Sequence, residues 1–241
     1  MKRVVLIFTA TILMAVCISA QTNKIPLIGS KAPEFSAVST TGNLTFPSDF
    51  GKSWKILFSH PADFTPVCST ELLELAHLQP NFDKLGVKVA VISTDNLELH
   101  KMWKAYLEEL DYKNRGKVAI NFPLIDDQNG TCSKMYGMLH EPVSSNRDIR
   151  GVFIIDSENI VRSINFYPTE VGRNMNEIVR IIKALQETSQ SHVFTPVNWQ
   201  DGDDVIVPYF PYTTNELALN PEIANEYYQL GNRIWFKKNN K

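Results

Sequence analysis

Residues 59–72, SHPADFTPVCSTEL, join a short apolar strand, expected at residues 56–58, to the start of a helix. Thr65 is a favourable N-cap residue, and Pro66 suits the first helical position. Cys68 is then the third residue of the helix. The apolar positions that would bury one face of this helix follow at Leu72, Leu75 and Ala76. A strand, a tight loop and a helix that begins at a cysteine are therefore predicted.

The position of Cys68 has chemical consequences. The first turn of a helix leaves backbone N–H groups unpaired, and the helix dipole is positive there, so an anion is favoured. Such a position favours the thiolate over the thiol, and the thiolate is the nucleophile. The plain alternative is a cysteine that only packs at a helix start. The spacing of Pro61, Thr65 and Cys68 favours a chemically reactive cysteine over one that only packs.

Strands and helices alternate along most of the chain. Further strands are expected at 87–93, 151–156 and 160–166, the last two as a hairpin. Apolar residues at helical spacing predict two amphipathic helices. The first has its apolar face at Leu99, Trp103, Tyr106, Leu107 and Leu110, and its start at Asp95 with Glu98; the second has its face at Met175, Ile178, Val179, Ile182 and Leu185. This pattern predicts an α/β fold with a sheet covered by helices.

The motif Pro61-x-x-x-Thr65-x-x-Cys68 resembles the signature of the peroxiredoxins. The run at 58–72 is similar to the one-cysteine subgroup of that family, including its histidine, here His60. The resemblance continues through RGVFIID at 150–156, GRN at 172–174 and PVNWQDGD at 196–203. It covers roughly residues 26 to 212. It implies a thioredoxin-like fold, a central mixed sheet flanked by helices, with a small C-terminal extension domain.

The resemblance also implies roles for single residues. Cys68 would be the peroxidatic nucleophile that reduces hydrogen peroxide and organic hydroperoxides and becomes a sulfenic acid. Thr65 would orient thiolate and peroxide, and Arg150 would hold both. Supporting roles would fall to Pro61, His60 and Arg173. Each of the five residues other than Cys68 has a plain structural alternative, as a helix cap, a loop residue, a buried histidine or a solvated charge.

The cysteine count bears on how the enzyme would be recycled. Cysteines stand only at 17, 68 and 132, too few for a disulfide scaffold. Cys132 matches no resolving position of the family and is predicted to be structural. An external thiol reductant is therefore expected. No cofactor and no metal are predicted, because the histidines show no ligand spacing with a cysteine. An alternative function is a redox sensor or chaperone-like holdase that uses the same thiol.

Charge and termini suggest the remaining expectations. With 24 basic and 26 acidic residues, the net charge of −2 argues against nucleic-acid binding. Residues 1–20 combine Lys2 and Arg3 with an apolar run and a small-residue end, which predicts a cleaved signal peptide and export; a lipid anchor at Cys17 is the alternative.

Residues 26–190 are the predicted catalytic domain. Residues 191–241 are the predicted extension. Its aromatic residues are expected to form a homodimer or a ring of dimers, and the alternative is that they fold back on their own chain.

Overall fold

A seven-stranded mixed sheet forms the centre of the main domain. In the computed structural model of the chain, which describes residues 25–239, the strand order is β2-β1-β5-β4-β3-β6-β7. Strand β3 pairs in parallel with β4 and antiparallel with β6, so these three strands lie in the middle. Their bounds are Trp54–Ser59, Val87–Ser93 and Arg150–Ile155. The outer strands are β1 (Phe35–Ser39), β2 (Gly42–Phe46), β5 (Leu124–Asp126) and β7 (Val161–Tyr167).

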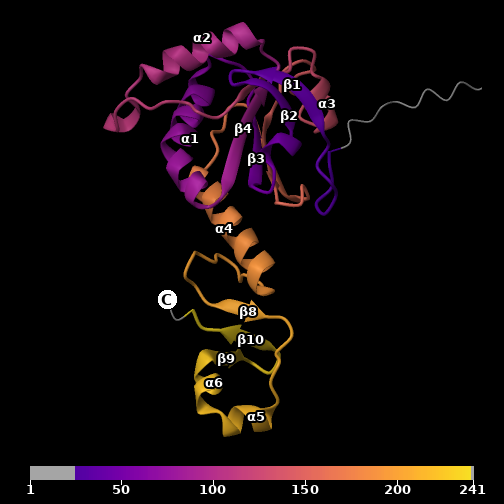
Figure 1. Cartoon of the computed structure of the whole chain (residues 1–241), viewed down its shortest axis with the longest axis vertical. Helices are drawn as coiled ribbons and strands as arrows, with labels where there is room; N and C mark the ends of the chain where they lie inside the picture. Colours follow the sequence, from indigo (N-terminus) through magenta and orange to yellow (C-terminus); the bar gives the residue numbers. More distant parts are fainter. Residues whose placement is uncertain (1–24, 240–241) are drawn as a thin grey trace, which may run out of the picture.

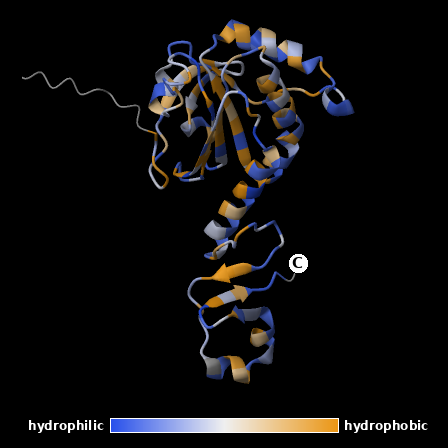
Figure 2. Cartoon of the chain, turned by 180° about the vertical axis from the view of Figure 1, so that it is seen from behind, coloured by the Kyte–Doolittle hydropathy of each residue, from blue (hydrophilic) through white to orange (hydrophobic). Residues whose placement is uncertain are grey.

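Two apolar clusters cover the two faces of this sheet. On one face, helices α1 (Pro66–Lys84), α2 (Leu97–Glu108) and α4 (Met175–Ser191) pack on side chains such as Phe58 and Val152. On the other, the β1–β2 hairpin and the short helix α3 (Thr131–Met135) pack on Leu57 and Phe153. Successive strand residues point to opposite faces, which explains this division. Figure 2 shows the apolar strands at the centre of the domain.

The C-terminal part forms a smaller unit beyond the end of α4 (Figure 1). It contains a three-stranded sheet, β8-β10-β9, and two short helices. Trp199 is 2% exposed and packs with Ala184 of α4, Val193 and Val205, which fixes the unit to that helix. The bounds are β8 Val205–Val207, α5 Thr214–Leu219, α6 Pro221–Glu226, β9 Tyr227–Leu230 and β10 Ile234–Lys237.

The α/β class and the expected strands are confirmed, but two details of the α2 prediction are wrong. The N-cap of α2 is Asn96, whose side chain accepts a hydrogen bond from the Leu99 amide. Asp95 instead faces inward, where it accepts from the Asp63 amide. Tyr106 is 50% exposed and does not contribute to the buried face. Leu110 lies beyond the helix end but is partly buried and packs against the same core cluster, as expected. Trp103 and Leu107 are buried as expected.

The two cysteines in the described part lie on opposite faces of the sheet. Cys68 belongs to the cluster under α1, and Cys132 to the cluster that contains α3. Both are free thiols. Within residues 25–239 no helix combines the length and apolarity that crossing a bilayer requires. The predicted signal peptide lies outside the described residues. The domain boundary at residue 190 stays a prediction; in the structure α4 continues across it to Ser191.

Candidate active site

Cys68 is the third residue of α1 and is fully buried at its N-terminus. Thr65 occupies the N-cap position as predicted, but its side chain does not cap the helix. Its hydroxyl turns back and donates to the Ala62 carbonyl at 2.8 Å. The first-turn amides therefore have no side-chain cap, and their partial positive charge stays directed at the region of the Cys68 sulfur.

The guanidinium of Arg150 lies against the Cys68 sulfur. Arg150 is the first residue of β6 and is only 2% exposed. Its Nη1 donates to Cys68 Sγ at 3.2 Å and to Glu71 Oε2 at 2.7 Å. Its Nε donates to the Thr169 carbonyl at 2.9 Å, and Nη2 donates to the same oxygen. An always-charged donor at this distance favours an anionic sulfur.

Arg173 and Glu71 hold Arg150 in place. Arg173 donates through Nε and Nη2 to Glu71 at 2.9 and 2.6 Å, and through Nη1 to the carbonyls of Ser59 and Gly151 at 2.7 and 2.8 Å. Burial lowers the pKa of Arg173 and Glu71 opposes it. Burial also works against ionisation of Glu71, but hydrogen bonds and charge from Arg173, with Arg150 adding, hold its pKa below the ordinary value.

The charges in this cluster do not cancel. Arg150 and Arg173 carry two positive charges, and Glu71 carries one negative charge. All three side chains are nearly inaccessible, with at most 3% exposed. A buried net positive charge is costly, and a thiolate at Cys68 would offset it. Sequence reasoning missed Glu71. The available signal was its position on the apolar face of α1, three residues after Cys68 and just before Leu72.

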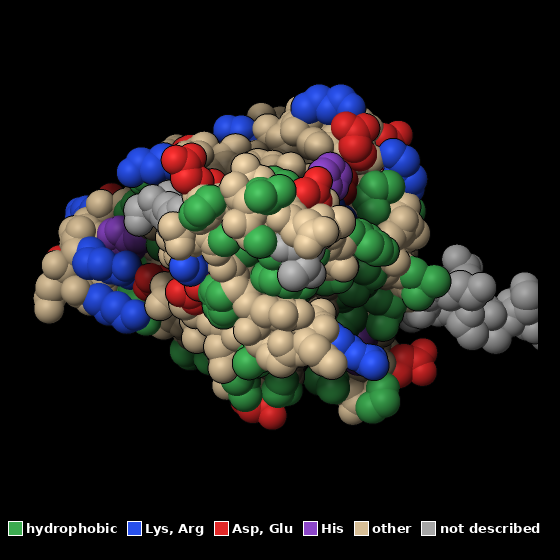
Figure 3. Space-filling model, turned by 90° about the horizontal axis from the view of Figure 1, so that it is seen from below, with side chains coloured by type: hydrophobic (Ala, Val, Ile, Leu, Met, Phe, Trp, Pro, Cys, Tyr) green, Lys and Arg blue, Asp and Glu red, His purple; other side chains and the backbone are tan. Residues whose placement is uncertain are grey.

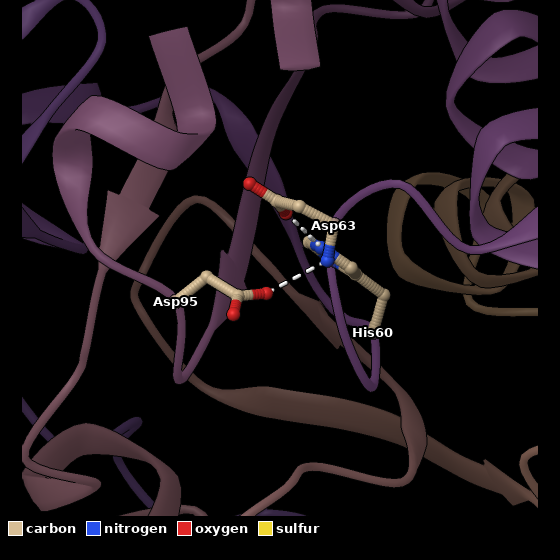
Figure 4. Close-up of side chains that lie close together, drawn as sticks. All are labelled: His60, Asp63 and Asp95. Atoms are coloured by element: carbon tan, nitrogen blue, oxygen red, sulfur yellow. Dashed lines mark hydrogen bonds and ion pairs between the residues drawn. The ribbon is translucent and has the colours of Figure 1, made fainter. Parts of the chain in front are cut away.

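His60 belongs to a second buried polar network, which joins it to Asp63 of the same loop between β3 and α1 and, through Asp63, to Asp95 (Figure 4). Its Nε2 lies 2.9 Å from Asp63 Oδ1, and Nδ1 of His100 lies 2.8 Å from the other Asp63 oxygen. Burial lowers the pKa of His60, with Asp63 acting in the opposite direction. None of the hydrogen bonds of His60 reaches Cys68. This placement fits its structural alternative, a buried histidine that orders the loop in which half-buried Pro61 lies.

Asp95 completes this second network. One of its oxygens accepts from the Asp63 amide at 2.7 Å, and the other accepts from Arg147 Nη1 at 2.5 Å. Ligand atoms of His60, Asp63 and Asp95 lie within 4.8 Å of one another, a grouping of a kind that can hold a metal ion. Each of the three residues already has a protein partner, however, and of their side-chain ligand atoms only His60 Nδ1 lacks a hydrogen bond within the described part of the chain. The cluster therefore acts in this structure as an anchor for the 60–65 loop.

Cys132 has an environment opposite to that of Cys68. It is 5% exposed, and burial raises the pKa of its thiol, with the Asp127 carboxylate adding to the effect. The oxygens of Asp127 accept from the amides of Cys132 and Ser133 at 3.0 and 2.7 Å. A thiol beside a fixed carboxylate is a poor nucleophile. The structure thus distinguishes the two cysteines by charge as well as by position.

A helix-start cysteine next to a buried guanidinium, on this sheet, defines a thiol peroxidase with a thioredoxin-like fold. The model of the AhpC/TSA family matches residues 28–164, and the model of the C-terminal domain of 1-Cys peroxiredoxin matches residues 184–220. The chain belongs to the AhpC/TSA family and is a peroxiredoxin, a thiol-dependent peroxidase. The family resemblance and the fold expected from the sequence are thereby confirmed.

Relatives and solved structures agree with this assignment. A peroxiredoxin of Methanosarcina mazei is 46% identical over 184 residues, which cover 76% of this chain and 84% of the relative. The mitochondrial peroxiredoxin PRX1 of Saccharomyces cerevisiae is 42% identical over 198 residues, 79% of this chain and 73% of that protein. The solved structure of Peroxiredoxin 6 of Arenicola marina aligns with a TM-score of 0.77 and 33% identity, covering 89% of this chain and 99% of that one.

Asp148, two residues before Arg150, is a further buried charge. It is 0% exposed, and neither of its carboxyl oxygens has a hydrogen-bond partner among the described residues. Burial raises its pKa to about 8, and the carboxylates of Asp127 and Asp95 add to the effect, against Ser133 and Arg147. At pH 7 the folded protein therefore keeps a proton that the unfolded chain, with an ordinary pKa near 3.8, has released.

This difference predicts a pH dependence of stability. Because the native state binds the extra proton, the free energy of unfolding should fall as pH rises from about 4 to about 8, by up to ~1.4 kcal/mol per pH unit from this group, and then level off. Asp148→Asn should lack this slope. Urea unfolding at several pH values would measure it, with exposed Asp201→Asn as control. Identical slopes for Asp148→Asn and the wild type would contradict the prediction.

Proposed function

We propose that Cys68 is the peroxidatic residue of this enzyme and that it reduces hydrogen peroxide and organic hydroperoxides. The Cys68 thiolate attacks one peroxide oxygen, an S–O bond forms and the O–O bond breaks. The leaving oxygen takes up a proton and departs as water or an alcohol, and Cys68 becomes a sulfenic acid. The observation that carries the proposal is the 3.2 Å contact between Arg150 Nη1 and Cys68 Sγ.

Arg150 and Thr65 would act directly in this step. Negative charge moves from the sulfur to the leaving oxygen, and a fixed guanidinium beside the sulfur stabilises both positions. The Thr65 hydroxyl, which already donates to the Ala62 carbonyl, keeps its lone pairs free to accept a hydrogen bond from the peroxide O–H. Pro61, half-buried in the same loop, would limit the access of water to the thiolate. Arg173 would act through Glu71, by positioning Arg150.

An external thiol would return the enzyme to its starting state. A first thiol condenses with the sulfenic acid to a mixed disulfide and water, and a second thiol releases the Cys68 thiol and a disulfide. The position of Cys132 supports the need for an external thiol. It lies on the opposite face of the sheet from Cys68, so it is not placed to form a disulfide with that residue. A solved yeast mitochondrial 1-Cys peroxiredoxin, 38% identical with a TM-score of 0.76 and covering 89% of this chain and all of its own, is described as resolved via glutathione/thioredoxin systems.

We also propose a homodimer, with a ring of dimers as its larger form, built through the C-terminal unit. This unit exposes large apolar side chains, and Figure 3 shows apolar groups over the lower end of the molecule. The most exposed are Tyr209 (89%), Val197 (87%) and Leu219 (79%). Apolar surface of this kind marks interfaces. Sedimentation equilibrium tests the proposal, and a monomer at micromolar concentration would refute it.

The basic and apolar pattern of residues 1–20 supports a further proposal, that the protein is exported after signal-peptide cleavage. A mature chain that begins near Gln21 is expected. The intact mass of the natural protein measures this directly, and a chain that retains residues 1–20 would contradict export by this route.

The roles of the two cysteines predict different variants. Cys68→Ser should lower the rate of single-turnover peroxide reduction by about 10³-fold or more, because the nucleophile is lost. Cys132→Ser should stay within about twofold of the wild type, since its thiol is buried beside Asp127. Stopped-flow peroxide consumption measures both.

Two results would contradict the proposal. Equal loss in both variants would show that Cys68 is not the sole peroxidatic residue. A wild-type rate no faster than that of a free thiol would favour the sensor or holdase alternative.

A further inference from the structure

The Ser59 hydroxyl bridges β3 and β6 at the point where the two strands separate. Ser59 is the last residue of β3 and is 0% exposed. The last paired residues of the β3–β6 ladder are Phe58 and Val152. Beyond them the backbone of Ser59 stays paired with β4, opposite Ile92, while β6 extends to its first residue, Arg150. At this junction a side chain, not the backbone ladder, connects the two strands.

Ser59 makes this connection on both sides of Arg150. Its Oγ donates to the Ile149 carbonyl at 2.7 Å and accepts from the Gly151 amide at 2.8 Å. A serine hydroxyl has one proton to donate and lone pairs to accept, so both bonds form at the same time. On the other edge of β6, Arg150 pairs with Tyr167 of β7. The backbone around Arg150 is thus held by Ser59 from one side and by the ladder with β7 from the other.

Gly151 leaves space for this hydroxyl because it has no side chain. A Cβ atom at residue 151 would lie 2.9 Å from Ser59 Oγ, closer than such atoms normally approach. It would also lie 3.2 and 3.4 Å from ring atoms of Phe166 and Phe153. Ser59 and Gly151 therefore depend on each other, since a methyl group at residue 151 would displace the hydroxyl.

The hydroxyl acts from the face of the sheet opposite Cys68. Side chains alternate along a strand, so Ser59 shares the face of Leu57, which belongs to the apolar cluster that contains α3. Phe58 points to the other face, into the cluster that contains Cys68. The Ser59 hydroxyl therefore reaches the Cys68 sulfur only through the position of Arg150, whose Nη1 lies 3.2 Å from that sulfur.

We propose that Ser59 is a positioning residue for the reaction of Cys68: its hydroxyl fixes the start of β6, so that the Arg150 guanidinium stays at the sulfur. The inference rests on the proposed function, since it assigns a role in the attack of Cys68 on a peroxide. The carbonyls of Ser59 and Gly151 both accept from Arg173 Nη1, so the same junction holds both arginines. Without the hydroxyl, β6 begins without its link to β3, and the guanidinium can shift away from the sulfur.

The reactivity of Cys68 in a Ser59→Ala variant tests this role. In single-turnover stopped flow, the second-order rate constant for hydrogen peroxide should be about tenfold lower than in the wild type. This loss is smaller than the factor on the order of 10²- to 10³-fold for removal of a donor, because Arg150 is displaced and not lost.

A pH titration of the Cys68 thiolate gives a second readout. Its absorbance at 240 nm is taken as the difference from the matching protein that also carries Cys68→Ser. The midpoint should lie about one pH unit higher in Ser59→Ala, because the anion loses part of its stabilisation. Ser133→Ala is the matched control. It removes an equally buried hydroxyl, which donates to Asp127, and should equal the wild type in both measurements.

A double variant separates positioning from a general loss of stability. If Ser59 acts through Arg150, Ser59→Ala should lower the peroxide rate by no more than about twofold in the Arg150→Gln background, because the group that it positions is already gone. A merely structural serine would lower the rate by the same factor in both backgrounds. Gly151→Ala, which displaces the hydroxyl without removing it, should lower the rate as Ser59→Ala does.

Two results would overturn the inference. In the first, folded Ser59→Ala keeps both the wild-type rate and the wild-type titration midpoint. In the second, its loss of rate is the same with and without Arg150→Gln, or is equalled by Ser133→Ala. If Ser59→Ala does not fold, a wild-type rate and midpoint in Gly151→Ala would refute the role. A wild-type protein that does not reduce peroxide refutes the proposed function, whereas the titration still shows whether Ser59 keeps Arg150 at the Cys68 sulfur.

Discussion

The contact between the Arg150 guanidinium and the Cys68 sulfur is the interaction on which the rest of the site depends. It exists because Glu71 forms ion pairs with two buried arginines, Arg150 and Arg173, while its single negative charge neutralises only one of them. A buried excess of positive charge is stable only next to an anion. A thiolate at Cys68 would supply that anion, and in the proposed reaction negative charge that moves onto a peroxide oxygen would stay within the same field. In the proposed mechanism, activation of the nucleophile and stabilisation of the leaving group would therefore have one source, the charge of Arg150.

The fold converts this local charge balance into a fixed geometry. Arg173 bonds to the carbonyl of Ser59 at the end of β3 and to that of Gly151 at the start of β6. Arg150 itself begins β6 and is tied to the loop at Thr169. The two arginines thus connect two antiparallel central strands to one carboxylate of α1, that of Glu71. Displacement of any of them would move the guanidinium relative to the sulfur.

Much of this arrangement could be predicted from the sequence. The local pattern from Pro61 to Cys68 determines a loop and a helix start, and the family resemblance supplied Arg150 and Arg173. Glu71 was missed because an acidic residue on a helix is normally solvated. Its burial is stable only because ion pairs with Arg150 and Arg173, which are distant in the sequence, offset the loss of hydration. The contact of two histidines with Asp63 also depends on residues that are distant in the sequence, since His100 lies 37 residues from Asp63. The sequence pattern therefore did not predict it. Asp95 and Asn96 have similar capping propensities, so only tertiary contacts decide which one caps α2.

The central claim is that the charge of Arg150 activates the Cys68 sulfur. The second-order rate constant for hydrogen peroxide in single-turnover stopped flow, compared between the wild type and Arg150→Gln, tests it most directly. Removing one charge-stabilising donor from an enzyme site costs on the order of 10²- to 10³-fold, and a loss of that size is expected here. Arg162→Gln, a partly exposed arginine of β7, should keep the wild-type rate. A folded Arg150→Gln protein that consumes peroxide as fast as the wild type would contradict the account.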